Sequence, residues 1–359
     1  TEKARLLLIS NPNAEGYVSK KDRPEEEGGG KFTNYGFKLS QEIEIAGQRG
    51  ARIEFAEKEL ARVRSEINDR ERVLISEVRD AFTMTLALKK KRNLAQEIVG
   101  LSEDFLGYTK IKFEAGDVSG LDVNLSEVEL SKAKKGLLLA EREYRESLLY
   151  LQGLLGLSPD VPLALIGDLP SEAPVLPNKE AVKALALSQR PDSKTSAFEM
   201  AKTQAALSLI RKEAIPNITL SAFYDRDEHK NVVGLGISIP LPIFDRKQAE
   251  KKEALAKAEG AKIRAAGLQK TIEREVDRVY SSLISAIEEL SLFKKEILVK
   301  AAENLKLLSL AFKEGKIGFF EVRLAQKDTI EAQLAFIDAQ MRTQLALNAI
   351  ERTIGGTVK

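Results

Sequence analysis

Apolar and polar residues alternate with a period of two in two short parts of the chain, of which the clearer lies between Ile215 and Phe244. Its apolar positions are Ile218, Leu220, Ala222, Tyr224, Val233, Leu235, Ile237 and Ile239. Because successive side chains of a strand point to opposite faces, the pattern predicts a β-hairpin with one apolar face. The opposite face carries Thr219, Ser221, Phe223, Gly234, Gly236 and Ser238, among which Phe223 is an apolar exception. We expect the polar tip of this hairpin at residues 225–231.

A weaker copy of the alternation lies near the start of the chain. Tyr35, Phe37 and Leu39 predict a return strand, and a poorly patterned outgoing strand is expected near residues 14–20. Residues 21–31 between them hold three glutamates and three consecutive glycines, which predicts a solvated and flexible loop. A phosphate-binding loop is disfavoured, because no Gly-Lys-Ser/Thr sequence follows the glycines.

Elsewhere apolar residues recur every three or four positions, which is typical of helices. One long helix is expected from about Gly50 to Phe113, and a second from about Arg246 to Phe312. In the second helix the apolar positions cover 44 residues in twelve steps, close to an 11-residue repeat, which indicates a nearly straight or slightly right-handed helix. A helix of this length spans roughly 100 Å, so it belongs to an extended bundle or tube rather than a compact globule.

Both long helices end in similar glycine-containing turns. Residues 113–123 (FEAGDVSGLDV) align with residues 312–322 (FKEGKIGFFEV) at an offset of 199, and the alignment continues without a gap to Gly156 and Gly355. The return strands align at an offset of 198. The chain is therefore an internal duplication in which each half consists of a hairpin, a long helix, a tight turn and another long helix.

The duplication predicts the organisation of the chain. Residues 157–178 contain five prolines and no periodicity, which predicts a linker or a small accessory region. The expected segments are 1–49 (first hairpin with the remnant of a preceding helix), 50–156 (first helical hairpin), 157–178 (linker), 179–214 (helix, with a break at Arg190-Pro191), 215–245 (second hairpin), 246–355 (second helical hairpin) and 356–359 (tail). Too few residues precede Pro12 for the first copy of the 179–214 helix, so we expect that segment upstream of Thr1.

Composition agrees with long helices and argues against several kinds of function. The chain is 31% charged and 6% aromatic, and its 56 basic and 54 acidic residues nearly balance, which gives no bulk attraction to nucleic acid. Without cysteine there is no disulfide or thiolate chemistry. The single histidine, His229, is expected to be an exposed loop residue rather than a metal ligand, and the three methionines are scattered. We expect no enzymatic activity, no cofactor and no bound metal.

Four strands per chain cannot close a barrel, because the smallest membrane barrels need about eight. Strands of about ten residues do match a bilayer crossed at a tilt. Several identical chains would have to combine their strands, which predicts a cyclic oligomer that encloses a channel.

The duplicated layout, the Pro-Asn pair before each outgoing strand and the paired turns resemble the TolC-type outer-membrane efflux proteins. Residues 41–49 (QEIEIAGQR) resemble their heavy-metal (cobalt–zinc–cadmium) branch. The resemblance implies a mostly α fold with a membrane β-barrel portion, built as a homotrimer with a shared 12-stranded barrel and an α-helical barrel. It implies a place in the outer membrane of a Gram-negative-type bacterium, helices in the periplasm, and export of divalent heavy-metal cations. The implied partners are a periplasmic adaptor (membrane fusion) protein, an inner-membrane RND-type pump and outer-membrane lipid.

The resemblance also assigns residues to two surfaces. The aligned turns would close the duct at its periplasmic tip and contact the adaptor through Gly116, Asp117, Ser119, Gly120, Leu121, Asp122, Gly315, Lys316, Gly318, Phe319, Phe320 and Glu321. Carboxylates repeated around a symmetry axis would form rings of negative charge, although ordinary solvated turns explain the same residues. The residues expected to face lipid are Tyr35, Phe37, Leu39, Ile218, Leu220, Ala222, Tyr224, Val233, Leu235, Ile237 and Ile239.

Two alternatives stay open. A duct of the same fold that exports drugs or proteins differs only in its substrate. A non-channel coiled-coil scaffold or adaptor is a protein of another class, but it has no reason to carry two apolar-faced hairpins of bilayer length, each flanked by prolines.

Overall fold

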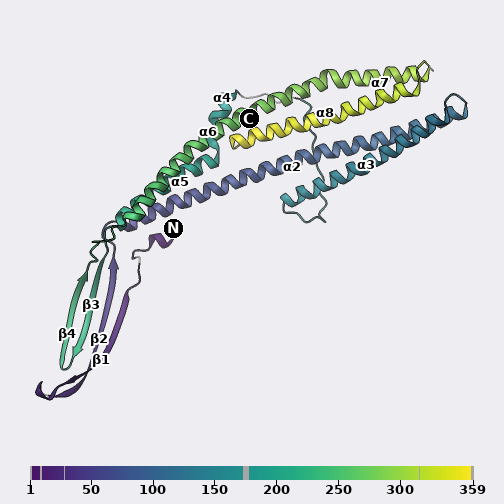
Figure 1. Ribbon diagram of the computed structural model, residues 1–359. Coiled ribbons are helices and arrows are strands. Elements are labelled where there is room, and N and C mark those ends of the chain that lie inside the picture. Colours follow the sequence, from purple (N-terminus) through teal and green to yellow (C-terminus); the bar gives the residue numbers. More distant parts are fainter. Residues whose placement is uncertain (1, 9, 28, 173–177, 315, 357–359) are drawn as a thin grey trace. The chain divides into compact units, whose positions relative to one another are not determined.

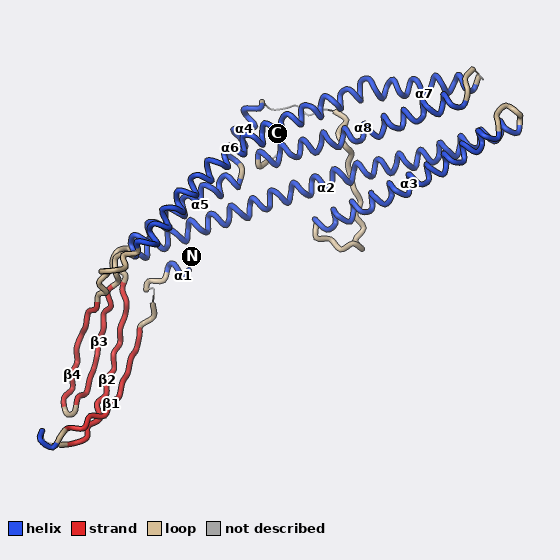
Figure 2. The backbone as a smooth tube through the Cα atoms, in the orientation of Figure 1, coloured by secondary structure: helices blue, strands red, loops and turns tan. Residues whose placement is uncertain are grey.

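The computed structural model describes residues 2–8, 10–27, 29–172, 178–314 and 316–356. Most of this part of the chain is helical, and the rest includes one four-stranded antiparallel sheet (Figures 1 and 2). The chain divides into two compact units, one made of Thr1–Ile67 with Pro191–Gln269 and the other of Asn68–Arg190 with Lys270–Lys359.

Two paired strands followed by long helices occur twice along the chain. The strands are β1 (Asn13–Arg23), β2 (Gly30–Ile43), β3 (Ile218–Asp227) and β4 (Lys230–Ser238). The helices are α1 (Glu2–Arg5), α2 (Gln48–Glu114), α3 (Gly120–Leu154), α4 (Lys179–Gln189), α5 (Pro191–Glu213), α6 (Gln248–Leu292), α7 (Leu298–Lys313) and α8 (Phe319–Ile354). A 3₁₀ turn η1 (Glu25–Glu27) joins β1 and β2, and a π-helical turn η2 (Phe293–Ile297) joins α6 and α7.

In the first unit the two hairpins pair edge to edge, so the strand order is β1-β2-β3-β4. Phe37 of β2 lies opposite Tyr224 of β3, which lies opposite Val233 of β4. Directly opposed residues share a face of a sheet, so the two alternating patterns join into one apolar face. Neither β1 nor β4 has a further strand on its outer side within the described chain.

The strands are longer than the sequence pattern indicated. In the first hairpin Lys21 and Asp22 pair with Phe32 and Lys31, so the loop expected at residues 21–31 is wrong at both ends. In the second hairpin pairing continues to Asp227 and Lys230, which leaves only Glu228 and His229 in the turn, with Glu228 at φ 54°. Backbone pairing continues through polar residues because the ladder is made by main-chain groups. In contrast, Ile239 lies beyond the last residue of β4.

A buried amide fixes the passage from β2 into α2. The side chain of Gln48, which is 2% exposed, accepts a hydrogen bond from the Ala46 N–H at 2.7 Å. It also donates to the carbonyl oxygen of Ile215 at 3.2 Å and to Oδ1 of Asn217 at 3.1 Å. The residues 41–49 that carry the family resemblance thereby join the two repeats at the base of the sheet.

The second unit contains two antiparallel helical hairpins that pack against each other. Hydroxyl contacts join α2 to α3 (Thr85 with Ser147) and α8 to α6 (Thr343 with the Ala286 carbonyl). Lys91 of α2 forms an ion pair with Asp338 of α8 at 2.6 Å, which places α2 and α8 side by side. These contacts join α3 to α2, α2 to α8 and α8 to α6, and an ion pair of Glu129 with Arg323 also joins α3 to α8.

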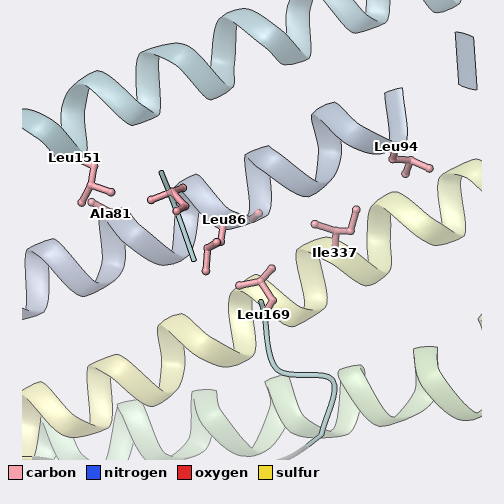
Figure 3. Packing of buried hydrophobic residues seen from close by; sticks show 8 residues of the cluster. Ala81, Leu86, Leu94, Leu151, Leu169 and Ile337 are labelled. Atoms are coloured by element: carbon pink, nitrogen blue, oxygen red, sulfur yellow. The ribbon is translucent and has the colours of Figure 1, made fainter. Parts of the chain in front are cut away.

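An apolar core of this unit lies where three helices meet the connection after α3. It consists of Ala81, Leu86, Ala87, Leu94, Leu151, Leu165, Leu169 and Ile337 (Figure 3). Leu165 and Leu169 belong to the segment 157–178, which forms neither helix nor strand where the structure describes it. This connection is therefore packed against the helices rather than being a free linker.

Two features of the helices differ from the expected pattern. The π-helical turn at residues 293–297 interrupts the second long helix, which the uniform spacing of apolar residues did not indicate. In α2 the large apolar residues Leu60, Ile67 and Leu74 are exposed, whereas small residues such as Ser65 and Ser76 are buried. Small residues let neighbouring helices approach closely, and the large ones lie on another side of the helix.

Candidate functional site

The apolar face of the sheet in the first unit is exposed. Strand pairing places ten of the predicted residues on it, namely Tyr35, Phe37, Leu39, Ile218, Leu220, Ala222, Tyr224, Val233, Leu235 and Ile237. On the outer strand β4 the exposed fractions are 78% for Val233, 88% for Leu235 and 72% for Ile237. A patch of this kind marks a surface that contacts protein or lipid.

The opposite sheet face is polar and contains glycines covered by aromatic rings. Tyr17 reaches across Gly36, and its hydroxyl donates a hydrogen bond to Asp225 at 3.0 Å. Phe223 lies opposite Gly234, and a Cβ atom at Gly234 would lie 2.4 Å from the ring. The pairing explains the apolar exception in the sequence pattern, because the Phe223 ring occupies the space that the glycine leaves.

The hairpin tips carry charged and aromatic contacts. Lys21 lies 3.2 Å from Glu228 and 3.8 Å from Asp227, and Asn34 donates to Asp227 at 2.7 Å. His229 is exposed in the turn, and its ring meets that of Phe32 edge to face at 5.4 Å. Within the described ranges, no three histidine, aspartate or glutamate side chains lie together in a way that would hold a metal ion.

The first of the two aligned turns, which joins α2 to α3 in the second unit, is stabilised by a reciprocal helix cap. Gly116 adopts φ 81°, a left-handed conformation that favours glycine, and α3 begins after Ser119. The Ser119 hydroxyl accepts from the Asp122 N–H at 3.3 Å, and the Asp122 carboxylate accepts from the Ser119 N–H at 2.9 Å. This capping box satisfies backbone donors that the start of a helix otherwise leaves open.

The carboxylates of the first turn both have partners. The hydrogen bond from the Ser119 hydroxyl, at 2.7 Å, is the main reason why the pKa of Asp122 is lowered. Asp117 accepts from Lys112 at 3.0 Å, and this contact raises the pKa of Lys112. Asp122 therefore has a structural role in the cap, and the negative charge of Asp117 is partly balanced within its own chain.

The second turn has the same position in its repeat but a different chemistry. Gly318 replaces the capping serine, and no side chain caps the start of α8. The Glu321 carboxylate lies against Gly318, with Oε2 3.0 Å from where a Cβ atom would be, and Lys316 pairs with Glu314 at 2.6 Å. Phe320 is 75% exposed. Gly315 and the side chain of Phe319 lie outside the described residues.

A groove of about 730 Å³ lies between α2, α3 and α8 in the same unit. Small residues of α3, Ala133, Gly136 and Ala140, line one wall. An ion pair between Glu129 of α3 and Arg323 of α8 lies among its lining residues. Partial burial raises the pKa of Glu129, but hydrogen bonds from Lys132 and Arg323 outweigh that effect and lower it.

Sequence reasoning missed the capping box and the groove. The series Ser119-Gly-Leu-Asp122 before an apolar run is a recognised cap signature and would have indicated the first. The groove had no such signal, because it depends on the packing of three helices. No helix in the described part of the chain has a stretch that is both long and apolar enough to cross a membrane.

Comparison with protein families gives one match. The family model "Outer membrane efflux protein" matches residues 16–157 and 183–356, which together make up most of the chain. The second sheet hairpin and both helical turns lie within the matched ranges, and so does the first sheet hairpin except for the first three residues of β1.

Individual relatives are more distant. The cobalt-zinc-cadmium resistance protein CzcC of Cupriavidus metallidurans is 26% identical over 326 residues, which cover 87% of this chain and 75% of CzcC. The pyoverdine export outer membrane protein OpmQ of Pseudomonas aeruginosa is 26% identical over 234 residues, which cover 62% of this chain and 49% of OpmQ. The solved structure of the outer-membrane channel OprN has the same fold, with a TM-score of 0.81 at 19% identity over 99% of this chain and 82% of OprN.

Proposed function

The chain belongs to the outer membrane efflux protein family, and from that membership we propose that it is the outer-membrane duct of a tripartite efflux system, assembled as a homotrimer. Proteins of this family are located in the outer membrane, with their helical part in the periplasm. The partners we propose are a periplasmic adaptor and an inner-membrane pump of the RND type.

The observation that carries the proposal concerns the surface and the edges of the four-stranded sheet. It exposes one apolar face, and its two outer strands have no strand beyond them in the described chain. Unpaired strand edges do not occur in lipid, because their backbone groups would have no partners. Three copies of a four-stranded sheet supply twelve strands, which is enough to close a barrel with lipid on the outside.

The helices support the same assembly. We propose that neighbouring copies pack against α3 on one side and against α6–α7 on the other. We propose that the two turns narrow the duct at its periplasmic end, where Asp117 and Glu321 contribute negative charge. The groove beside Ala133 and Gly136 is the surface that we assign to the adaptor, because small residues admit a helix closely.

We propose that the exported substrates are divalent heavy-metal cations. CzcC matches 87% of the chain, whereas the pyoverdine export protein OpmQ matches 62% at the same identity. The longer match favours the metal assignment. Export of small organic molecules is the second candidate, and it is supported by the OpmQ likeness.

The assembly is tested by mass and by conductance. Light scattering of the detergent-purified protein should give three times the mass of the chain, and planar bilayers should show discrete channel openings. A protein that stays monomeric and monodisperse without detergent, and that forms no channels, would instead support the scaffold alternative.

The substrate is tested in a strain that lacks the gene. Restoring the gene should raise tolerance of zinc, cobalt and cadmium and leave sensitivity to organic drugs unchanged. The reverse result, with drug tolerance restored and metal tolerance unchanged, would contradict the metal assignment but not the duct.

A further inference from the structure

The apolar positions of β4 continue beyond the end of the strand. Every second residue from 233 to 243 is a large aliphatic residue, and all six are exposed: Val233, Leu235, Ile237, Ile239, Leu241 and Ile243. Leu241 is 75% exposed, Ile243 62% and Phe244, which follows, 91%. The first six residues of the connection from β4 to α6, 239–244, are therefore apolar and exposed, as the apolar face of the strand is.

The first repeat has different residues at the corresponding positions. At the offset of 198 residues, Pro240 and Pro242 correspond to Glu42 and Glu44. Glu42 accepts hydrogen bonds from Asn217 at 2.8 Å and from Ser10 at 3.3 Å, and Glu44 pairs with Arg52. The end of β2 and the start of the connection after it are thus attached to their own chain by polar contacts. The connection after β4 has prolines in place of both carboxylates.

The backbone of residues 239–244 suits an apolar environment. Pro240 and Pro242 have no N–H to satisfy, and the Ile243 N–H donates to the Leu241 carbonyl at 2.9 Å. The carbonyl of Pro242 accepts from Arg246 at 3.2 Å, and that of Phe244 from Gln248 at 3.1 Å. Unsatisfied backbone groups keep irregular segments out of lipid, and the two prolines and these three hydrogen bonds reduce the number of such groups in residues 239–244.

Length gives an independent argument. The apolar positions within β4, from Val233 to Ile237, span only about 13 Å at 3.3 Å per residue. The series continues past the strand to Ile239, Leu241 and Ile243, although the hydrogen bond from the Ile243 N–H to the Leu241 carbonyl shortens its last step. With these residues the apolar series comes closer to the roughly 25 Å apolar band of an outer-membrane barrel than the apolar positions of β4 do alone.

We propose that residues 239–244 lie in the periplasm-facing leaflet of the outer membrane and complete the lipid-contacting surface of β4. This inference rests on the proposed function, since it requires the sheet to face lipid. These residues then contact the acyl chains and headgroups of the lipid. Phe244 then lies at the boundary of the bilayer, where aromatic rings are enriched, and Arg246 follows at the level of the phosphates.

The competing occupant is a second copy of the chain. In a closed ring β4 adjoins β1 of the next copy, whose Leu6, Leu7 and Leu8 precede that strand and are exposed. We favour lipid because Ile239, Leu241 and Ile243 continue the alternation of the apolar sheet face, whereas a neighbouring copy adjoins the edge of β4. The two occupants give different spectroscopic results.

The absence of tryptophan from the chain makes the test direct. Four single-tryptophan variants, Leu241→Trp, Ile243→Trp, Leu235→Trp and Ser238→Trp, are reconstituted as full-length protein into phosphatidylcholine vesicles. The vesicles carry bromine either near the headgroup or near the methyl end of the acyl chains, because bromine quenches only tryptophans that it contacts. Leu235→Trp reports on the proposed lipid face, and Ser238→Trp on the opposite face.

We expect Leu241→Trp and Ile243→Trp to lose emission, more with bromine near the headgroup than with bromine at the chain end. Blue-shifted emission without quenching would assign the segment to a second copy, and red-shifted emission without quenching would assign it to water; either result overturns the proposal. With either of these two results, quenching of Leu235→Trp in the same vesicles would still support a sheet that faces lipid, and so the proposed function. If Leu235→Trp is not quenched, the proposal that the sheet faces lipid is itself contradicted.

Discussion

The hydroxyl oxygen of Tyr17 lies 3.0 Å from Oδ1 of Asp225, and the two side chains meet above Gly36. Tyr17 is on β1, Gly36 on β2 and Asp225 on β3, so the hydrogen bond bridges both hairpins across a residue that has no side chain. A Cβ atom at Gly36 would lie 2.1 Å from the carboxylate and 2.4 Å from the ring. The contact therefore depends on glycine.

Substituting Gly36→Ala should destabilise the sheet. Either the ring or the carboxylate must move, and overpacking of this kind costs about 1–3 kcal/mol. We expect a lower midpoint of thermal unfolding in detergent, measured at equal protein concentration.

Gly16→Ala is the matched control for this prediction. A Cβ atom at Gly16 has as its nearest neighbour the Gly36 carbonyl oxygen at 3.8 Å, which is an ordinary contact. The control should unfold close to the original midpoint. Equal decreases of the unfolding midpoint in the two variants would mean that the effect comes from replacing any strand glycine and not from the Tyr17–Asp225 contact.

The sequence predicted the faces of the sheet but not this contact. Alternation with a period of two depends only on neighbours along the chain, so the apolar positions of both hairpins could be identified. Tyr17 and Asp225 are 208 residues apart, and their approach depends on which residues of separate hairpins lie opposite one another. The same limit left Phe223 unexplained until its partner Gly234 was known.

Gln48→Ala should destabilise the junction between β2 and α2. The substitution leaves the Ala46 N–H without its acceptor and the Ile215 carbonyl without this donor in a buried place, which costs about 1–3 kcal/mol. Gln248 provides the comparison, because it accepts from the Arg246 N–H at 2.7 Å in the same local arrangement but is exposed. Thermal unfolding of both variants should show the larger loss for Gln48→Ala, and a larger loss for Gln248→Ala would contradict the assigned role.

Acid should weaken the contact between α2 and α5 in the first unit. Glu59 accepts from Arg62 at 2.9 Å and lies 2.9 Å from Lys202, and the bond from Arg62 is the main reason why its pKa is lowered to about 2. A lowered pKa in the folded protein means that the contribution to stability is complete above the ordinary value of about 4.3 and is lost as the pH falls toward 2. Unfolding midpoints measured from pH 5 to about 2 should fall less steeply in Glu59→Gln than in the original protein.

Glu66→Gln is the control for the acid effect. Glu66 bonds to the same arginine at 3.0 Å within α2, is 49% exposed at its side chain, and has no contact with α5 among the described ion pairs. A pair of this kind within one helix contributes about 0.3–0.5 kcal/mol. In Glu66→Gln the unfolding midpoint should fall with pH as steeply as in the original protein. An equally reduced pH dependence in both variants would contradict the role assigned to Glu59.

The helical turns show a second limit of sequence reasoning. Their glycines and their place at the ends of long helices could be identified from the repeat, but three acidic residues were treated alike. In the structure Asp122 completes a cap, Asp117 pairs with Lys112, and Glu321 lies over Gly318. Each difference arises from one neighbouring residue, so the chemistry of the turns depends on their local contacts rather than on the shared motif.

Ser119→Ala should fray the start of α3. Loss of a serine cap costs about 1 kcal/mol, so the backbone amides of the first turn of α3 should exchange with solvent several-fold faster. Hydrogen exchange followed by mass spectrometry over this peptide measures the effect. Gly318→Ser, at the equivalent place in the second turn, should slow exchange at the start of α8 or leave it unchanged. Unchanged exchange in Ser119→Ala would contradict the capping role.

Removing the charge of each partner of one ion pair, in two separate variants, tests whether the turn between α2 and α3 lines the duct. Asp117→Asn removes one negative charge per chain and Lys112→Gln removes the positive charge that balances it, at a contact of 3.0 Å. If the turn narrows the pore, the substitutions act on cation preference in opposite directions, because the field in a constriction follows its net charge. Reversal potentials in planar bilayers under a salt gradient should therefore shift toward weaker cation preference in Asp117→Asn and toward stronger preference in Lys112→Gln. Glu321→Gln should resemble Asp117→Asn. Identical reversal potentials in all three variants would place the turns away from the conducting path, whereas shifts of the same sign in both members of the pair would indicate a change of shape rather than of charge.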